Sequence, residues 1–181
     1  KLPSMLRDFP PARTAPTMRT PDGVVVPETI AIAEELASRH PDAGIWPSDP
    51  GARAVARVLA AEMHAGFGAL RSLCPMNLRV SYTDCTPPDA VLADLARLDV
   101  IWAWAREQTG AKGPWLCGDY SAADAFYAPV TARIAGYNLS VSDAGAAYVA
   151  AHLAHPSFRK WRATGMVDLP DQPFYRRDYP T

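Results

Sequence analysis

The sequence has 181 residues, of which 49% are hydrophobic and 20% are charged, a composition that can bury a sizeable core and argues against a disordered chain. Its 18 basic and 19 acidic side chains give a formal charge of −1 without a basic stripe, so nucleic acid is not expected as the main partner. The longest run free of Asp, Glu, Lys and Arg, residues 144–158, is too short and polar for a membrane span, and no secretory leader is visible.

The first 27 residues contain six prolines, and a long helix is excluded there because proline has no amide donor. Two short β-favouring runs, residues 15–18 and 24–26, flank a Pro-Asp-Gly turn at 21–23, which predicts an antiparallel hairpin. A helix is predicted over residues 28–40, because Ile32 and Leu36 are four residues apart and Pro41 ends the run.

After a predicted linker the pattern becomes helical. Asp49 is a plausible N-cap with Pro50 in the first helical position. Apolar residues recur on one face as far as Leu70, which predicts a single helix over residues 49–73. Capping motifs at residues 86–89 and 121–124 predict two more helices, and Gly110 ends the first of them. Shorter helices are predicted over 143–154 and 156–163.

Several short motifs follow one another in a fixed order along these predicted elements. Ala15-Pro16 precedes the first strand, and Glu28-Thr29 opens the helix after the hairpin. The remaining motifs are Glu62-Met63-His64-Ala65-Gly66-Phe67, Pro75-Met76-Asn77, Gly118-Asp119-Tyr120-Ser121-Ala122-Ala123-Asp124-Ala125 and His155-Pro156. Each motif is weak by itself, but the ordered set resembles a bacterial branch of the glutathione transferase family over nearly the whole chain.

The resemblance implies an α+β, mostly α fold in four parts. Residues 1–41 are expected to form the second half of a thioredoxin-like, glutathione-binding domain, and 42–48 a linker. Residues 49–165 are expected to form the all-α C-terminal domain, and 166–181 an extended tail. In the family, the residue that activates the glutathione thiol follows the first strand of the thioredoxin-like domain. That strand is expected before Lys1, so the catalytic residue is unknown.

The resemblance also implies a glutathione site on the first part of the chain. The X-Pro bond before the third strand of a thioredoxin-like domain is cis, and its backbone faces the cysteinyl part of glutathione, a role that falls on Ala15 and Pro16. Glu28 and Thr29 are expected to hold the γ-glutamyl end at a helix N-terminus, with Thr29 in the place of the family's usual Ser. Alternatively, Pro16 is a strand-edge proline without a ligand, and Glu28 and Thr29 merely cap the helix.

A second cluster, Met63, His64, Phe67 and Arg71, spans two helical turns. Met63 and Phe67 suit the core, whereas His64 and Arg71 can face the cleft where the family binds its electrophile. There His64 would donate a hydrogen bond near neutral pH, and Arg71 would attract an anionic group. The alternative is that His64 is structural.

Other polar residues are assigned to structure. Ser121 and Asp124 form a predicted capping box, worth about 0.5–2 kcal/mol. His152 and His155 lack a third ligand on their turn, and three scattered cysteines suggest reduced thiols rather than a zinc site. No metal is expected, and the pair Arg176-Arg177 is interpreted as a solvated run.

These interpretations predict a cytoplasmic, homodimeric glutathione transferase that conjugates glutathione, its co-substrate, to a small electrophile in detoxification. Two alternatives remain open. One is a non-catalytic, transferase-like binding or scaffold protein. The other is a related glutathione-dependent isomerase or dehalogenase that uses the same site.

Overall fold

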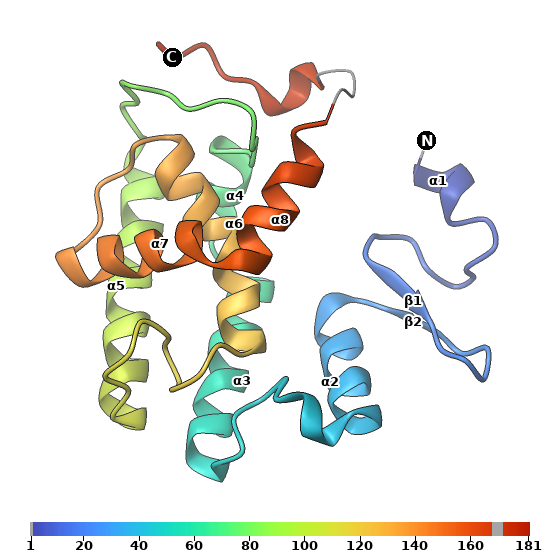
Figure 1. Cartoon of the computed structure of the whole chain (residues 1–181). Helices are drawn as coiled ribbons and strands as arrows, with labels where there is room; N and C mark the ends of the chain where they lie inside the picture. The colour runs from blue at the N-terminus through green and yellow to red at the C-terminus, as the bar shows by residue number, and fades with distance from the viewer. Residues whose placement is uncertain (1, 168–171) are drawn as a thin grey trace.

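The computed structural model describes residues 2–167 and 172–181. A small hairpin with its neighbouring short helices lies beside a larger helical bundle (Figure 1). The first part contains α1 (Leu2–Met5), β1 (Thr17–Arg19), β2 (Val25–Pro27), α2 (Thr29–Arg39) and η1 (Pro41–Ala43). The bundle contains α3 (Pro50–Ala65), α4 (Gly68–Leu73), α5 (Asp89–Thr109), α6 (Ala122–Gly136), α7 (Asp143–Ala154) and α8 (Pro156–Gly165), and η2 (Pro173–Tyr175) follows.

The hairpin has the antiparallel arrangement that the Pro-Asp-Gly turn predicts. β1 pairs with β2 in the register Thr17–Pro27 and Arg19–Val25. The turn is closed by the Thr20 amide, which donates to the Val24 carbonyl at 2.9 Å, and Gly23 adopts the left-handed φ of 89° that favours glycine. Pro27 sits at the edge of this two-stranded sheet, where a missing amide is tolerated.

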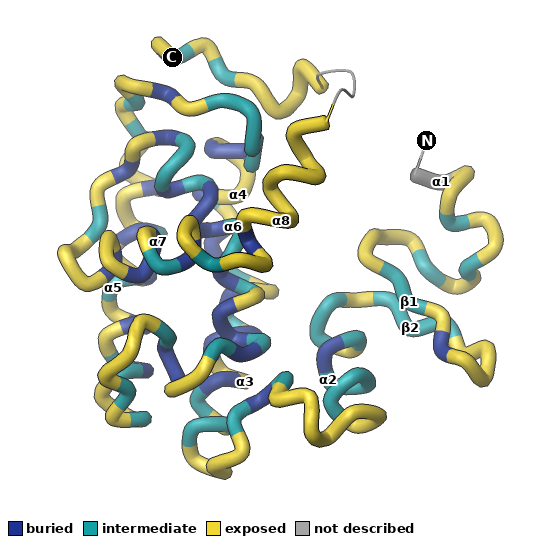
Figure 2. Tube along the Cα trace, in the orientation of Figure 1, coloured by how far each residue is buried: buried dark blue, intermediate teal, exposed yellow. Residues whose placement is uncertain are grey.

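The core lies in the helical bundle, where the buried residues are concentrated on α3 to α7 (Figure 2). Tyr127, Leu59 and Leu98 are fully buried at its centre. In α2 only Ala33 is fully buried, while Ile32, Leu36 and Ala37 are half-buried. This helix is joined to α3 by Arg57, which donates two hydrogen bonds of 2.9 Å to the carboxylate of Glu34.

The predicted continuous helix over residues 49–73 is wrong, because the chain breaks between α3 and α4. Gly66 is extended, and Phe67 has the left-handed φ of 57°. Phe67 turns its ring edge-on to Tyr127 in the core, with ring centroids 6.4 Å apart. The backbone amide of Leu70, in the first turn of α4, donates a hydrogen bond to the side chain of Asp94 on α5 at 2.8 Å. Tertiary packing therefore ends a helix that the apolar periodicity would continue.

The helix starts confirm some predicted caps and contradict another. Asp49 accepts from the Ala52 amide at 2.8 Å, as predicted for the start of α3. The capping box at residues 86–89 is wrong: α5 begins at Asp89 with Pro88 as N-cap, and no side chain caps it. Gly110 ends α5 with the left-handed φ of 65°, as predicted.

Arg177 attaches the C-terminal segment to the end of α4. Arg177 donates hydrogen bonds to the carbonyls of Ser72 at 3.0 Å and Leu73 at 3.2 Å, and its amide donates to the Tyr82 hydroxyl. The interpretation of Arg177 as part of a solvated run is therefore wrong, because its guanidinium satisfies carbonyls at the end of a helix. Residues 168–171 of the predicted tail lie outside the described residues.

Candidate functional site

The hairpin register brings the residues of the predicted glutathione site to one end of the sheet. Because Thr17 pairs with Pro27, the next positions outward are Pro16 and Glu28. The Ala15–Pro16 peptide bond is cis, in agreement with the resemblance, and both residues are exposed. The Thr14 hydroxyl donates to Glu28 Oε1 at 3.0 Å, which ties the two segments together.

The start of α2 has no side-chain cap. Glu28 is its N-cap residue, but its side chain makes no capping bond, and its φ of 75° is unusual for a residue with a Cβ. The first backbone amides of an uncapped helix carry partial positive charge and unsatisfied donors, which suit a carboxylate. Glu28 therefore stands at the helix start without a capping hydrogen bond from its own side chain. Thr29 is half-buried at the same helix start.

Glu28 also reaches the helical bundle. Oε2 of Glu28 lies 3.7 Å from Nε2 of His64, at the C-terminal end of α3. His64 thus stands between the start of α2 and the cavity described next.

A cavity of about 620 Å³ lies between α2 on one side and α3, α4 and α6 on the other. Six of its lining residues are Thr29, Met63, His64, Arg71, Phe126 and Arg133. Most of the remaining wall is apolar, from residues such as Ile32, Leu36 and Pro129. The volume falls within the range usual for small-molecule sites. Three of the four residues predicted for an electrophile pocket therefore share one cavity.

The fourth, Phe67, is not among the residues that line this cavity. Its side chain is buried in the core against Tyr127, and only 5% of its surface is exposed. Phe67 lies at the helix break with a left-handed φ of 57°, and its ring packs into the core instead.

Arg133 is a wall residue that the sequence analysis missed. It comes from α6, where its Nε donates to the Cys74 carbonyl at 2.9 Å and one Nη donates to the Pro129 carbonyl at 3.0 Å. Burial, and then the nearby positive charge of Arg71, lower the pKa of the Arg133 guanidinium from its ordinary value. In the sequence, Arg133 stands out as a lone cation within the otherwise apolar second half of α6, and this pattern could have pointed to it.

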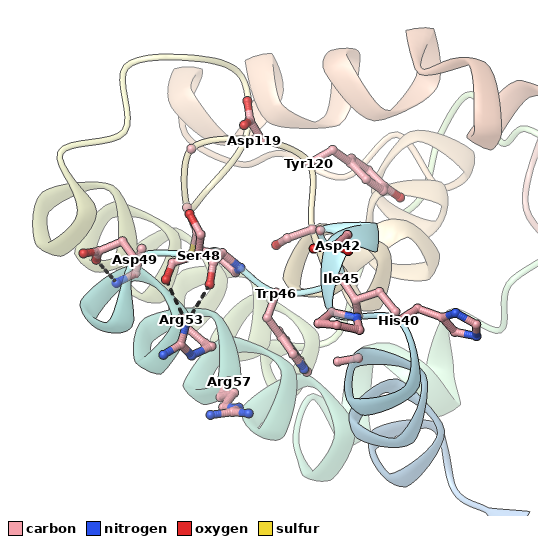
Figure 3. A pocket seen from close by; sticks show the side chains of 18 of the residues that line it. His40, Asp42, Ile45, Trp46, Ser48, Asp49, Arg53, Arg57, Asp119 and Tyr120 are labelled. Atoms are coloured by element: carbon pink, nitrogen blue, oxygen red, sulfur yellow. Dashed lines mark hydrogen bonds between the residues drawn. The ribbon is translucent and has the colours of Figure 1, made fainter.

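A second cavity of about 760 Å³ lies along the linker, between η1, α3 and the loop before α6 (Figure 3). At one end, Arg53 donates to the carbonyl of Ser48 at 2.8 Å and to that of Pro47 at 3.2 Å, which fastens the linker to α3. Trp46 lies in the middle of the view, and His40 and Asp42 lie at the other end. Two residues predicted as helix caps, Asp49 and Ser121, border this space, whereas none of the residues predicted for the glutathione site or the electrophile pocket does.

The predicted capping box at the start of α6 is present. The Asp124 carboxylate accepts from the amides of Ser121 at 3.0 Å and Leu116 at 3.2 Å, and from the Tyr148 hydroxyl at 2.9 Å. Burial nevertheless raises the pKa of Asp124, although these bonds oppose the shift. His152 is buried beside it, with Nε2 at 2.9 Å from the Asp124 carbonyl.

Other features of the described residues bear on chemistry. The three cysteines are free, and burial raises the pKa of Cys74 to about 11 and of Cys117 to about 12, which keeps both thiols protonated at neutral pH. Within residues 2–167 and 172–181, no cluster of three His, Cys, Asp or Glu side chains is placed to hold a metal ion. No helix in the described part of the chain has the length and apolar character needed to cross a membrane.

Comparison with known proteins finds a sequence relative that matches only part of this chain. No protein-family model matches the sequence. A curated Caenorhabditis elegans protein named as a probable maleylacetoacetate isomerase is 37% identical over 75 residues. That stretch is 41% of this chain and 35% of the relative, so the match spans well under half of the relative's length.

Solved structures match over much more of the chain. A glutathione transferase homolog from Burkholderia GL BGR1, with bound glutathione, has a TM-score of 0.63 and 23% identity, covering 91% of this chain and 79% of that one. A glutathione S-transferase from Rhodospirillum rubrum F11 has a TM-score of 0.61 and 20% identity over 97% and 82%. A maleylacetoacetate isomerase from Anaeromyxobacter dehalogenans 2CP-1, with bound dicarboxyethyl glutathione, has a TM-score of 0.56 and 20% identity over 93% and 78%.

These matches establish the fold. The chain has the architecture of the glutathione transferases, with the hairpin and α2 as part of a thioredoxin-like unit and α3 to α8 as the all-helical unit. The expectation of fold class is confirmed.

Proposed function

We propose that the protein is a glutathione transferase that conjugates glutathione to a small electrophile. The observation that carries this proposal is the position of an uncapped helix start, at Glu28 and Thr29, beside an apolar cavity of about 620 Å³. The contact between Glu28 and His64 joins these two features. Glutathione-bound structures of the same fold support the choice of co-substrate.

In this proposal the α2 N-terminus binds the γ-glutamyl carboxylate through its free amides, and Glu28 accepts the γ-glutamyl ammonium. The backbone at Ala15 and Pro16 faces the cysteinyl part. Met63 and the apolar wall then hold the electrophile close to the sulfur, which supplies catalysis by proximity. The residue that activates the thiol is not assigned to any position of this sequence.

The chemical step needs no further reactant. The thiol gives up its proton, and the sulfur electron pair forms a C–S bond to the electrophilic carbon. With a halide substrate the bond to the leaving group breaks. With an activated double bond the π bond breaks, and the neighbouring carbon takes a proton from water.

A glutathione-dependent isomerase is the second candidate. It is favoured by the names of two similar proteins, the Caenorhabditis elegans relative and the Anaeromyxobacter dehalogenans structure, both maleylacetoacetate isomerases. In an isomerase the C–S bond would form by addition to a double bond of the substrate. Rotation about the resulting carbon–carbon single bond would follow, and the C–S bond would then break and regenerate glutathione. A dehalogenase and a non-catalytic binding protein remain further alternatives.

We also propose that the protein is a cytoplasmic homodimer that acts in detoxification. The unpaired cysteines support a reducing compartment. The dimer and the detoxification role rest on the resemblance to the family.

The test is a product assay on the purified protein with glutathione and a panel of electrophiles, analysed by mass spectrometry. A transferase accumulates the glutathione adduct and consumes glutathione in equal amount. An isomerase converts its substrate at constant glutathione concentration. Binding of glutathione without either product indicates a binding protein, and the absence of binding contradicts all three.

A further inference from the structure

Two arginines from different helices share the wall of the 620 Å³ cavity without an acidic partner. Arg71 comes from α4 and Arg133 from α6, and neither forms a salt bridge within the described residues. Their protein partners are neutral backbone carbonyls. Two positive charges therefore border a largely apolar space, and no acidic side chain is among the described residues that line it.

The pattern of hydrogen bonds leaves donors free on both guanidinium groups. Arg71 uses one Nη to reach the carbonyls of His64 at 3.0 Å and Gly66 at 3.4 Å. Its Nε and its other Nη form no bond to a described residue, and these two atoms make the edge that binds a carboxylate in bidentate geometry. Arg133 uses its Nε and one Nη, and its second Nη has no hydrogen-bond partner within the described part of the chain.

The two charges also act on each other. Both line the same cavity, and the charge of Arg71 contributes to the lowered pKa of Arg133, second only to burial. Repulsion between like charges in a partly desolvated cavity is relieved when an anion binds between them. A purely structural role would need only the carbonyl contacts.

We propose that this cavity binds a small apolar molecule with a carboxylate, held by Arg71 and Arg133, while its body contacts the wall around Met63 and Phe126. The identification of this molecule as the electrophile rests on the proposed function, whereas the binding itself does not. The substrate class is then a carboxylate-bearing electrophile rather than a neutral one.

The test uses a matched pair of probes in isothermal titration calorimetry. Ethacrynate is a carboxylate with an activated double bond, and its saturated form, dihydroethacrynate, cannot react with a thiol. Dihydroethacrynate and its methyl ester differ in the charge of one group. We expect the acid to bind more tightly than the ester, and Arg71→Gln to weaken binding of the acid about tenfold to a hundredfold. In Arg71→Gln, the ratio of the dissociation constants for the ester and the acid is therefore expected to move toward one.

Variants separate recognition from structure. Arg71→Lys keeps the charge but loses the bidentate edge, so its affinity for the acid is expected between those of the parent and Arg71→Gln. Arg133→Gln is expected to act in the same direction, and Arg133→Lys replaces it if the lost carbonyl bonds prevent folding. Arg159→Gln, an exposed arginine on α8 outside the cavity, is the control and is expected to change neither affinity.

Equal binding of acid and ester by the parent protein would overturn the inference. An Arg71→Gln variant that weakens the binding of acid and ester equally would also overturn it, because that result indicates that Arg71 only shapes the cavity. A second arm measures conjugation of ethacrynate and its ester with glutathione. Preference for the acid without conjugation would reject the proposed function and retain this inference. Conjugation without preference for the acid would support the proposed function and reject this inference.

Discussion

His64 on α3 and Glu28 at the start of α2 face each other with 3.7 Å between Nε2 and Oε2. The two residues lie in different structural units, and each belongs to a different half of the proposed site. Glu28 stands where the γ-glutamyl end of glutathione is expected, and His64 lines the cavity proposed for the electrophile. A bound glutathione would therefore meet both.

This pair is expected to contribute little to stability. Both side chains are substantially exposed, 53% for Glu28 and 38% for His64, and exposed ion pairs contribute roughly 0–1 kcal/mol. A double-mutant cycle of Glu28→Gln and His64→Ala in urea unfolding should give a coupling energy below about 1 kcal/mol. A coupling of several kcal/mol would make the pair a structural clasp instead.

The break between α3 and α4 should depend on Gly66. A Cβ at this position would lie 2.7 Å from the Glu62 carbonyl oxygen, so Gly66→Ala forces the backbone to move. We expect a loss of about 1–3 kcal/mol in the free energy of unfolding, measured by urea denaturation.

Gly68→Ala is the matched control, two residues further on. A Cβ there meets no atom within 4 Å, and the residue opens α4. The substitution should be neutral or stabilise by about 0.5–1 kcal/mol. If both variants behaved alike, the close approach to the Glu62 carbonyl oxygen would not be what requires glycine at position 66.

Asp124 should contribute more to stability than its partner in the capping box. Asp124→Ala strands three buried donors, from Leu116, Ser121 and Tyr148, at about 1–3 kcal/mol each. We expect a loss of at least about 3 kcal/mol, against about 0.5–2 kcal/mol for Ser121→Ala. Asp143→Ala, on the exposed first turn of α7, is the control. Equal losses for Asp124→Ala and Ser121→Ala would show that the carboxylate serves only as a cap.

His152 should make stability depend on pH. Burial lowers the pKa of His152 below its ordinary value of 6.5, although the bonds to the carbonyls of Asp124 and Tyr148 oppose this shift. Between the lowered pKa and 6.5 the unfolded chain binds more protons than the folded one, so this contribution to stability rises with pH. The slope is at most about 1.4 kcal/mol per pH unit.

His152→Gln removes that titration and retains a donor for the Asp124 carbonyl. The difference in unfolding free energy between parent and variant, measured by urea denaturation from acid to neutral pH, should therefore grow as the pH rises to 6.5. The raised pKa of Asp124 makes its contribution to stability fall as the pH rises. Because Asp124 is present in both parent and variant, this opposite trend cancels to first order in the difference between them. A difference that is constant with pH would contradict the assignment.

Local signals in the sequence were enough for most elements. The Pro-Asp-Gly turn predicted the hairpin, Asp49 and Ser121 marked helix starts, and Gly110 marked a helix end. Each of these features depends on bonds or φ values within a few residues, which a sequence carries directly.

Features that depend on distant partners were not predicted. The helix break at Phe67 depends on Tyr127, and the placement of Arg177 depends on carbonyls of Ser72 and Leu73. Arg133 belongs to the candidate site because α6 borders the same cavity as Arg71 on α4. No local pattern carries such contacts, because they follow from how the helices pack.

The central claim is that glutathione binds at the start of α2. Calorimetric titration of the protein with S-methylglutathione, which lacks a free thiol, tests it without requiring turnover. We expect a saturable one-to-one complex whose affinity falls about tenfold to a hundredfold in Glu28→Gln, since a charge-assisted bond to the ligand ammonium is lost. Glu107→Gln, at an exposed position on α5, should match the parent. No binding by the parent protein, or equal affinity in Glu28→Gln, would contradict the account.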